Sequence, residues 1–171
     1  MTSAIVLPQL GPWAQGHIRS IVQATKQEDF DAAFDAFVAQ DVEVTFNGEK
    51  ISQDEYKRRL QTEAFLESGA QVVFNGTVQV PGKDDAGVQS QFIGEAGIFY
   101  TAIIAEGILV LGAPQTRQVT SSINIVVKDD PSLQPPHLPG GIRGFFDPRR
   151  AFKVNQVFLE GAASGSGAND S

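Results

Sequence analysis

The spacing of apolar residues predicts two consecutive helices near the start of the chain. Between residues 17 and 40, apolar positions recur every three or four residues, which places them on one face of a helix. The polar run TKQED, residues 25–29, separates two sets of apolar residues, one for each helix. Thr25 and Glu28 match a capping box, so the second helix is expected to begin there. The sets are Ile18, Ile21 and Val22, followed by Phe30, Ala33, Phe34, Phe37 and Val38.

The period changes to two over residues 41–46. Apolar and polar side chains alternate there, as they do in a strand with one buried face. Asn47-Gly48 then supplies the positive φ angles of a tight hairpin turn, and a short return strand passes through Ile51. The apolar set consists of Val42, Val44 and Phe46.

A further helix is predicted from Ser52 to about Leu66. Ser52 and Glu55 form a second capping box, which marks the helix start. The apolar positions that follow lie four residues apart, as on one helix face. They are Tyr56, Leu60 and Ala64.

Most of the chain beyond residue 70 reads as extended, because apolar residues alternate with polar ones. The polar run PGKDDAG, residues 81–87, is placed for a hairpin turn, and Gly94, Gly97 and Gly107 mark candidate bulges or bends. A Pro-rich excursion over residues 129–150 is too long for a plain hairpin loop. The predicted strands cover residues 71–80, 88–111, 115–128 and 151–160.

One of these strands has a polar residue on its apolar side. In residues 115–128, Ser121 interrupts a row of aliphatic side chains. The opposite side of the same strand is more polar and includes Asn124. The aliphatic row is Val119, Ile123, Ile125 and Val127, and the opposite row is Thr120, Ser122, Asn124 and Val126.

Length and composition predict one domain. The chain has 171 residues, of which 42% are hydrophobic and 19% charged, enough for one well-formed core. We expect an N-terminal arm over residues 1–16, a single domain over 17–160 that includes the 129–150 excursion, and a flexible low-complexity tail over 161–171. The fold class is α+β, with helices packed on one face of a strongly curved, mostly antiparallel sheet.

Charge and cysteine content limit the partners. A net charge of -7 argues against binding to nucleic acid or to an anionic membrane, because phosphate contacts need clustered Lys and Arg. The absence of cysteine removes thiolate metal sites and fits a reducing compartment. No His and acid cluster has metal-ligand spacing, so no metal and no cofactor are predicted. The apolar run at residues 4–7 is too short for a signal peptide or a membrane span, which favours a soluble, cytoplasmic protein.

The stretch FDAFVAQDVEVTFNGEKISQDEYKRRL, residues 34–60, followed by long strands, resembles the nuclear transport factor 2-like (NTF2-like) superfamily, which includes SnoaL-like proteins. The resemblance covers residues 18–160 and lies in the element order, the strand and turn DVEVTFNG and the helix after it. It implies a cone whose mouth is a pocket between the helices and the concave sheet. It also implies a homodimer formed through the outer sheet face.

The resemblance makes missing residues informative. Enzymatic relatives place an acidic residue near the end of the first strand or on the long strands, where an apolar cavity raises its pKa. Here Phe46 and Asn47 occupy that strand end, and neither can act as a base. We therefore predict a noncatalytic domain. The alternative is a SnoaL-like isomerase, cyclase or dehydratase whose acid or base is Glu95, Tyr56 or Tyr100.

The aromatic residues suggest a binding site for a small apolar molecule inside the cone. Tyrosine and asparagine side chains that point inward would need a partner, which a ligand supplies. Packing of the protein's own core is the alternative for any single phenylalanine. The predicted ligand-binding residues are Trp13, Tyr56, Phe74, Phe92, Tyr100 and Asn124.

A third hypothesis is a homodimeric interaction module that acts through the sheet face and the 129–150 excursion. Aromatic and arginine residues are typical of protein interfaces, and the excursion holds both. It could instead cover the cone mouth as a lid, or be disordered. The residues in question are Arg143, Phe145, Phe146, Arg149 and Arg150.

Overall fold

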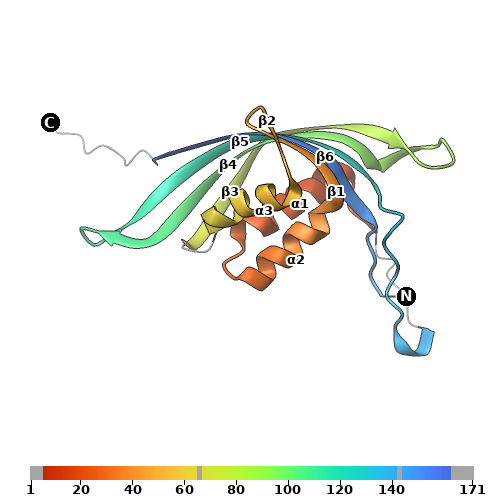
Figure 1. Cartoon of the computed structure of the whole chain (residues 1–171), viewed down its shortest axis with the longest axis horizontal. Helices are drawn as coiled ribbons and strands as arrows, with labels where there is room; N and C mark the ends of the chain where they lie inside the picture. Colours follow the sequence, from red (N-terminus) through yellow and green to blue (C-terminus); the bar gives the residue numbers. More distant parts are fainter. Residues whose placement is uncertain (1–5, 65–66, 142–143, 163–171) are drawn as a thin grey trace.

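The computed structural model describes residues 6–64, 67–141 and 144–162 (Figure 1). Within these residues, three α-helices pack on one face of a six-stranded sheet. The elements, in chain order, are α1 (Leu10–Gln23), α2 (Gln27–Phe37), β1 (Val38–Phe46), β2 (Glu49–Ile51), α3 (Gln53–Ala64), β3 (Glu67–Lys83), β4 (Gln89–Val110), β5 (Ala113–Asp129), the 3-10 turn η1 (Pro139–Gly141) and β6 (Arg149–Ala162).

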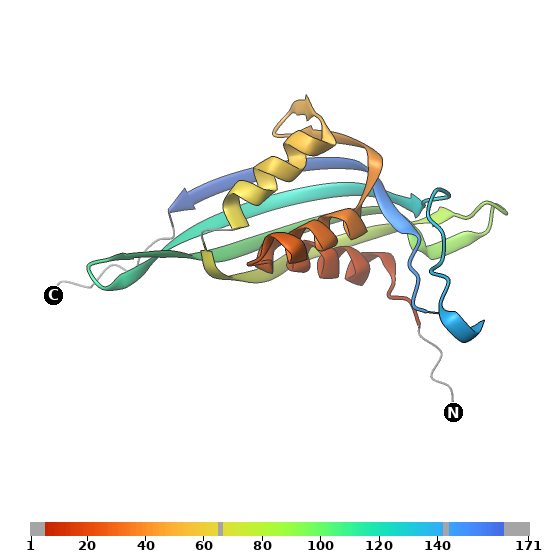
Figure 2. The ribbon, with the colours of Figure 1, turned by 60° about the horizontal axis from the view of Figure 1, so that its bottom comes forward.

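The sheet is open and mixed, with strand order β2-β1-β6-β5-β4-β3. Neighbouring strands within the sheet are antiparallel, except β1 and β6, which run parallel to each other. The long strands arch over the helices, and the β3–β4 and β4–β5 hairpins extend beyond them at opposite ends (Figures 1 and 2). The α+β cone expected from the sequence is therefore confirmed.

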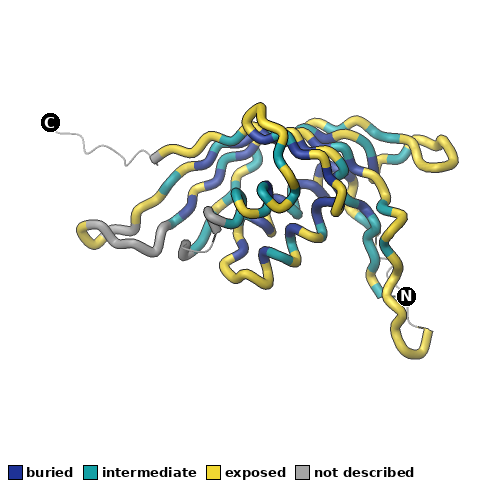
Figure 3. Tube along the Cα trace, in the orientation of Figure 1, coloured by how far each residue is buried: buried dark blue, intermediate teal, exposed yellow. Residues whose placement is uncertain are grey.

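The core lies between the helices and the concave face of the sheet, where the buried segments gather (Figure 3). Helix α1 and helix α2 each present one apolar stripe to the sheet, as the spacing in the sequence predicted. The strands contribute alternate residues, so every second side chain is buried between Ala96 and Ile104 of β4 and between Val119 and Val127 of β5. Representative members are Trp13 and Ile18 of α1, Phe30 and Phe34 of α2, Ile98 of β4 and Ile123 of β5.

The β1–β2 hairpin turns as its sequence predicts. Asn47 has a φ of 49° and Gly48 a φ of 84°, the left-handed conformation that these two residue types adopt most readily. The Asn47 side chain also bonds to β6: its Nδ2 donates to the Phe158 carbonyl at 3.0 Å, and its Oδ1 accepts from the Phe158 N–H at 2.7 Å. Asn47 thus continues the β1–β6 pairing beyond the end of β1.

A bend in the β3–β4 pair depends on Gly94. This residue has a φ of 131°, and the register of the pair shifts beside it, between Pro81 and Gly82. A Cβ atom at Gly94 would lie 2.1 Å from the Val80 carbonyl oxygen and 2.5 Å from the Gly82 nitrogen. Only glycine fits where the two backbones approach so closely.

The structure corrects the N-terminal boundary. Helix α1 begins at Leu10, so the expected arm of residues 1–16 includes its first two turns. Pro12 is tolerated there because the first turn of a helix needs no N–H donor, and the Gly11 N–H donates to Gln79 Oε1 at 2.7 Å. The expected tail also begins too early, since β6 extends to Ala162; residues 163–171 lie outside the described residues.

The 129–150 excursion leaves the sheet after β5 and extends beyond the helices near the N-terminal end of the chain (Figure 1). Its two ends are held together by the Asp130 N–H, which donates to the Pro148 carbonyl at 2.8 Å. In the part of the chain that the structure describes, no helix has the length and apolarity to cross a membrane.

Candidate functional site

A group of four polar side chains lies inside the cone, surrounded by the apolar core. Tyr56 comes from α3, Tyr100 from β4, Ser121 from β5 and Gln156 from β6, and each is at most 3% exposed. The Tyr56 hydroxyl donates to Gln156 Oε1 at 2.7 Å. Gln156 Nε2 donates to the Tyr100 hydroxyl oxygen at 3.2 Å and to Ser121 Oγ at 2.9 Å. We call these four residues the interior network.

Sheet register and helix packing assemble the interior network. Tyr100 and Ser121 are directly opposite each other on β4 and β5, so their side chains lie on the same face. Tyr56 reaches this face because its ring packs between Phe34 and Phe46, at centroid distances of 5.8 and 6.1 Å. The network therefore joins α3 to three strands.

The two tyrosines stay protonated. Burial raises the pKa of Tyr56 well above its ordinary value, and the charge of Tyr100 would raise it further. Burial also raises the pKa of Tyr100, although hydrogen bonds from Ser121 and Gln156 oppose the shift. At neutral pH both are hydrogen-bond donors and cannot act as bases.

The described interior contains no buried carboxylate or imidazole. The buried polar side chains other than the tyrosines are Ser121, Arg149 and Gln156. Farther along the inner face of β5 and β6, Arg117 and Glu160 form an ion pair in which Glu160 is exposed. The interior network can thus donate hydrogen bonds to a carbonyl or hydroxyl oxygen, but it cannot abstract a proton from carbon.

The interior network has more polar hydrogens than internal contacts to accept them. Its three hydroxyls and one primary amide carry five polar hydrogens, and four contacts, including a Tyr100–Ser121 bond, use four of them. The remaining hydrogen belongs to Tyr100 or Ser121. Turning the Gln156 amide around does not remove the surplus, because Tyr56 would then accept a bond and keep its own hydrogen.

The sequence predicted two members of the interior network, Tyr56 and Tyr100, and the structure brings them together. Phe74 lies beside them, with its ring centroid 6.2 Å from that of Tyr100. Ser121 and Gln156 were not predicted as site residues. The signal was present in both strands, because Ser121 lies between Val119 and Ile123, and Gln156 between Val154 and Phe158, in stretches where the other inward residues are apolar.

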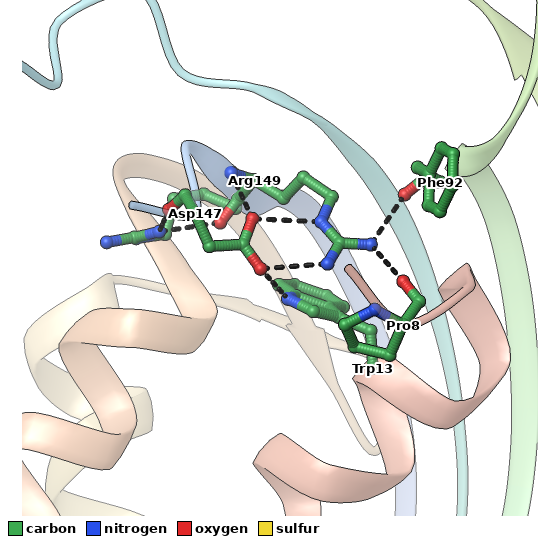
Figure 4. Close-up of polar contacts among 6 residues, drawn as sticks. Pro8, Trp13, Phe92, Asp147 and Arg149 are labelled. Atoms are coloured by element: carbon green, nitrogen blue, oxygen red, sulfur yellow. Dashed lines mark hydrogen bonds and ion pairs between the residues drawn. The ribbon is translucent and has the colours of Figure 1, made fainter. Parts of the chain in front are cut away.

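Trp13 and Phe92 belong to a different cluster, which is centred on Arg149 (Figure 4). Arg149 is 1% exposed and pairs with Asp147, with Nη2 2.8 Å from Oδ2 and Nε 2.9 Å from Oδ1. Its Nη1 donates to the carbonyls of Pro8 and Phe92, at 2.7 and 3.2 Å. The prediction that Trp13 and Phe92 line the cone together with the tyrosines is therefore not met.

Trp13 completes the Arg149 cluster by donating from Nε1 to Asp147 Oδ2 at 3.0 Å, while its ring lies under the guanidinium, 5.3 Å from the Arg149 Cζ. Burial alone would raise the pKa of Asp147, but the hydrogen bonds and charge of Arg149 keep it below its ordinary value. The cluster joins the N-terminal segment, the start of β4 and the end of the excursion.

Asn124 and Glu95 face away from the cone. Both are exposed on the outer face of the sheet, where they line a shallow hollow of about 380 Å³. Asn124 Oδ1 lies over Gly97 of the neighbouring strand. The prediction that Asn124 orients a ligand in the cone is therefore not met, and the alternative in which Glu95 acts as a buried acid does not fit its exposed position.

No group of three or more His, Cys, Asp or Glu side chains within the described ranges has a geometry suited to a metal ion.

Neither a family model nor a curated protein matches this sequence. Among solved structures, a protein from Streptomyces galilaeus proposed to be a hydroxylase is 9% identical, with a TM-score of 0.51 over 86% of this chain and 90% of its own. An NTF-2-like protein of unknown function from Pseudomonas aeruginosa is 12% identical (TM-score 0.42; 86% and 94% covered). A proposed polyketide cyclase from Xanthomonas campestris pv. campestris is 17% identical (TM-score 0.42; 84% and 88% covered). At such identities the likeness concerns the fold alone.

Proposed function

We propose that this chain is a noncatalytic NTF2-like domain that binds a small, mainly apolar molecule inside its cone. The observation that carries the proposal is the hydrogen-bond count of the interior network, which leaves one hydroxyl hydrogen, on Tyr100 or Ser121, without an acceptor among the described residues. A buried donor without an acceptor costs about 1–3 kcal/mol, so an acceptor atom on a ligand would be stabilised there. The ligand class is an apolar, ring-containing molecule with one carbonyl or ether oxygen.

The surroundings of the interior network favour such a ligand. Phe74 and Phe158 are only partly buried and pack against the core, Phe74 beside Tyr100 and Phe158 beside Phe46. Their rings offer apolar contact area, while the network supplies one directed hydrogen bond. This combination of an apolar lining and few polar groups is typical of small-molecule sites.

A matched pair of ligands tests the proposal. 2-Acetylnaphthalene carries a ketone oxygen, and 2-isopropylnaphthalene has nearly the same shape without an acceptor. Isothermal titration should show that the protein binds the ketone about 3- to 10-fold more tightly, the contribution of one hydrogen bond. Native mass spectrometry of the purified chain should in addition detect any ligand that is retained from the expression host.

Matched variants assign the preference to the interior network. The Tyr100→Phe/Ser121→Ala double variant removes both hydroxyls and should bind the two compounds equally. Ser122→Ala is the control, because Ser122 lies on the opposite face of the same strand. Absence of binding by either compound, or equal binding by the unchanged protein, would contradict the proposal.

The alternative function is that of an isomerase, cyclase or dehydratase. Each of these activities abstracts a proton, whereas Tyr56 and Tyr100 remain protonated at neutral pH. In deuterated water we expect no exchange of the methyl hydrogens of 2-acetylnaphthalene above the buffer rate, measured by proton NMR. Exchange that requires the protein would favour the enzyme.

The chain is further proposed to form a homodimer through the outer sheet face. Seven large apolar side chains are between 42% and 70% exposed on that face. Thr120 and Ser122, which lie among them, are uncharged, which lowers the cost of burying this part of the face; Glu95, opposite Val80, carries a charge and would lie at the rim of the interface. A second copy offers the same surface, as a two-fold interface requires. The apolar residues are Val73, Val78, Val80, Phe99, Ile103, Val157 and Leu159.

A further inference from the structure

A groove of about 500 Å³ lies outside the cone, where α1 and the end of α2 meet the Pro-rich excursion. Its lining includes Trp13, His17, Phe145 and Arg150, together with Asp147, whose carboxylate is paired with Arg149. Figure 4 shows the neighbouring Arg149 cluster, which holds Trp13 in place. We call this hollow the α1 groove. Its volume suits a small molecule.

Arg150 brings an incompletely bonded guanidinium to the α1 groove. Its Nε donates to the Asp35 carbonyl at 2.9 Å, and its Nη1 donates to the carbonyls of Asp147 and Arg149 at 2.9 and 2.7 Å. These bonds fix the guanidinium but leave Nη2 without a partner in the described chain. They also go to neutral carbonyls, so the Arg150 guanidinium makes no direct ion pair within the described residues, although the charges of Asp147, Asp130 and Asp35 act on it from farther away.

His17 brings a second polar group, for which no hydrogen bond is found among the described residues. Its ring lies against Trp13 at a centroid distance of 4.4 Å and against Phe37 at 5.9 Å. Neither ring nitrogen makes a hydrogen bond to another described residue. These aromatic contacts fix the orientation of the imidazole, so a ligand would meet a positioned N–H or lone pair.

The walls of the α1 groove are apolar and partly open to solvent. Phe145 is 59% exposed, and Pro8 and Pro12 are also exposed. Together these three residues present an exposed apolar patch beside the Arg150 guanidinium, and such patches often mark binding sites. A flat ring bound between Phe145 and Trp13 would cover this apolar area.

We propose that the α1 groove binds a small aromatic carboxylate. The Arg150 Nη2 and the His17 ring would hold the carboxylate, while the aromatic body would contact Trp13 and Phe145. The inference is independent of the ligand proposed for the cone, since it rests on other residues. The cone ligand is uncharged, whereas the ligand of the α1 groove is an anion. The chain as a whole is acidic, so an anion would be recognised here by local contacts rather than by long-range attraction.

The probe is 2-naphthoate, with the uncharged 2-naphthamide as its matched control. Titration followed by naphthalene fluorescence should show that the carboxylate binds about tenfold more tightly than the amide, the difference expected of a charge-assisted hydrogen bond. His17→Phe keeps the ring packing and removes only the nitrogens; it should weaken naphthoate binding severalfold. Phe145→Ala should weaken both compounds.

Arg150→Gln should abolish the preference for naphthoate over naphthamide, and Arg150→Lys should keep part of it. Lys50→Gln removes the same charge from strand β2 and should leave the preference unchanged.

Arg150→Gln also removes bonds that hold the excursion, so the melting temperature of this variant must be measured. His17→Phe provides the test if Arg150→Gln unfolds. Equal affinity for the two compounds, or naphthoate binding that the His17 and Arg150 variants leave intact, would overturn the proposal. Displacement of naphthoate by 2-acetylnaphthalene would do the same, since it would locate the carboxylate in the cone.

Discussion

The packing of His17 in the folded protein keeps its imidazole uncharged at neutral pH. Burial lowers the pKa of His17 to about 4; the charges of Arg150 and Arg149 also lower it, while the charge of Asp147 raises it. In the unfolded chain its pKa would be near the ordinary 6.5. Between these two values the unfolded chain takes up a proton that the folded protein does not bind.

The free energy of unfolding should therefore decrease as pH falls from about 6.5 to about 4. Since the ring is partly open to solvent, we expect the loss from His17 to be about 1–2 kcal/mol. Urea unfolding of the protein at several pH values measures the decrease. His17→Phe should lose less stability over the same range, because the proton that His17 takes up in the unfolded chain is then absent. Equal pH dependence of the two proteins would contradict this prediction.

Two glycines of β4 allow a matched test of the bend in the sheet. Gly94→Ala should destabilise the fold by roughly 3 kcal/mol or more, because the new Cβ meets backbone atoms at 2.1 and 2.5 Å. Gly97→Ala should cost less than about 1 kcal/mol, because its Cβ meets the Asn124 side chain, which is exposed and can turn away. Chemical denaturation of both variants gives the two values. Similar losses would show that the bend does not depend on Gly94.

Single residues differ in how well their position can be predicted from sequence. The strict alternation of residues 115–128 already put Asn124 on the side opposite Ile123, so its outward orientation was available from the pattern. Glu95 was not predictable in this way, because the bend at Gly94 interrupts the alternation just before it. The partners of Arg149 were also out of reach, since Pro8 lies 141 residues away in the chain.

At the scale of elements, the interior network holds α3 on the sheet. Gln156→Leu should destabilise the fold by about 2–4 kcal/mol, because it leaves the buried hydroxyls of Tyr56, Tyr100 and Ser121 short of partners. Tyr56→Phe alone should cost about 1–2 kcal/mol. The double variant should cost less than the sum of the two, because both changes remove the same hydrogen bond. Additive losses in urea denaturation would show that Tyr56 and Gln156 are not coupled.

The two capping boxes show what local patterns can and cannot decide for an element. Ser52 caps α3 as predicted, with its Oγ accepting from the Glu55 N–H at 3.1 Å. The prediction for Thr25 was wrong, because α2 begins after Lys26 and has no side-chain cap. The helix still forms there, since burial of its phenylalanines against the sheet outweighs the missing cap. Element type followed from periodicity, and the local cap predicted the start of α3 but not that of α2.

At the scale of the whole molecule, the outer sheet face determines whether the chain can remain alone. If two copies pair through this face, Phe99→Glu should convert the dimer to a monomer, because each copy would bury an unpaired carboxylate next to its own symmetry mate. Phe99 is 45% exposed, and Phe145, on the α1 groove, is 59% exposed. Phe145→Glu therefore adds the same charge at a comparably exposed phenylalanine and should leave the dimer intact. Sedimentation velocity over a range of concentrations distinguishes the two states. A monomer at every concentration for the unchanged protein would rule out the proposed dimer, and dissociation by Phe145→Glu alone would move the interface to the excursion.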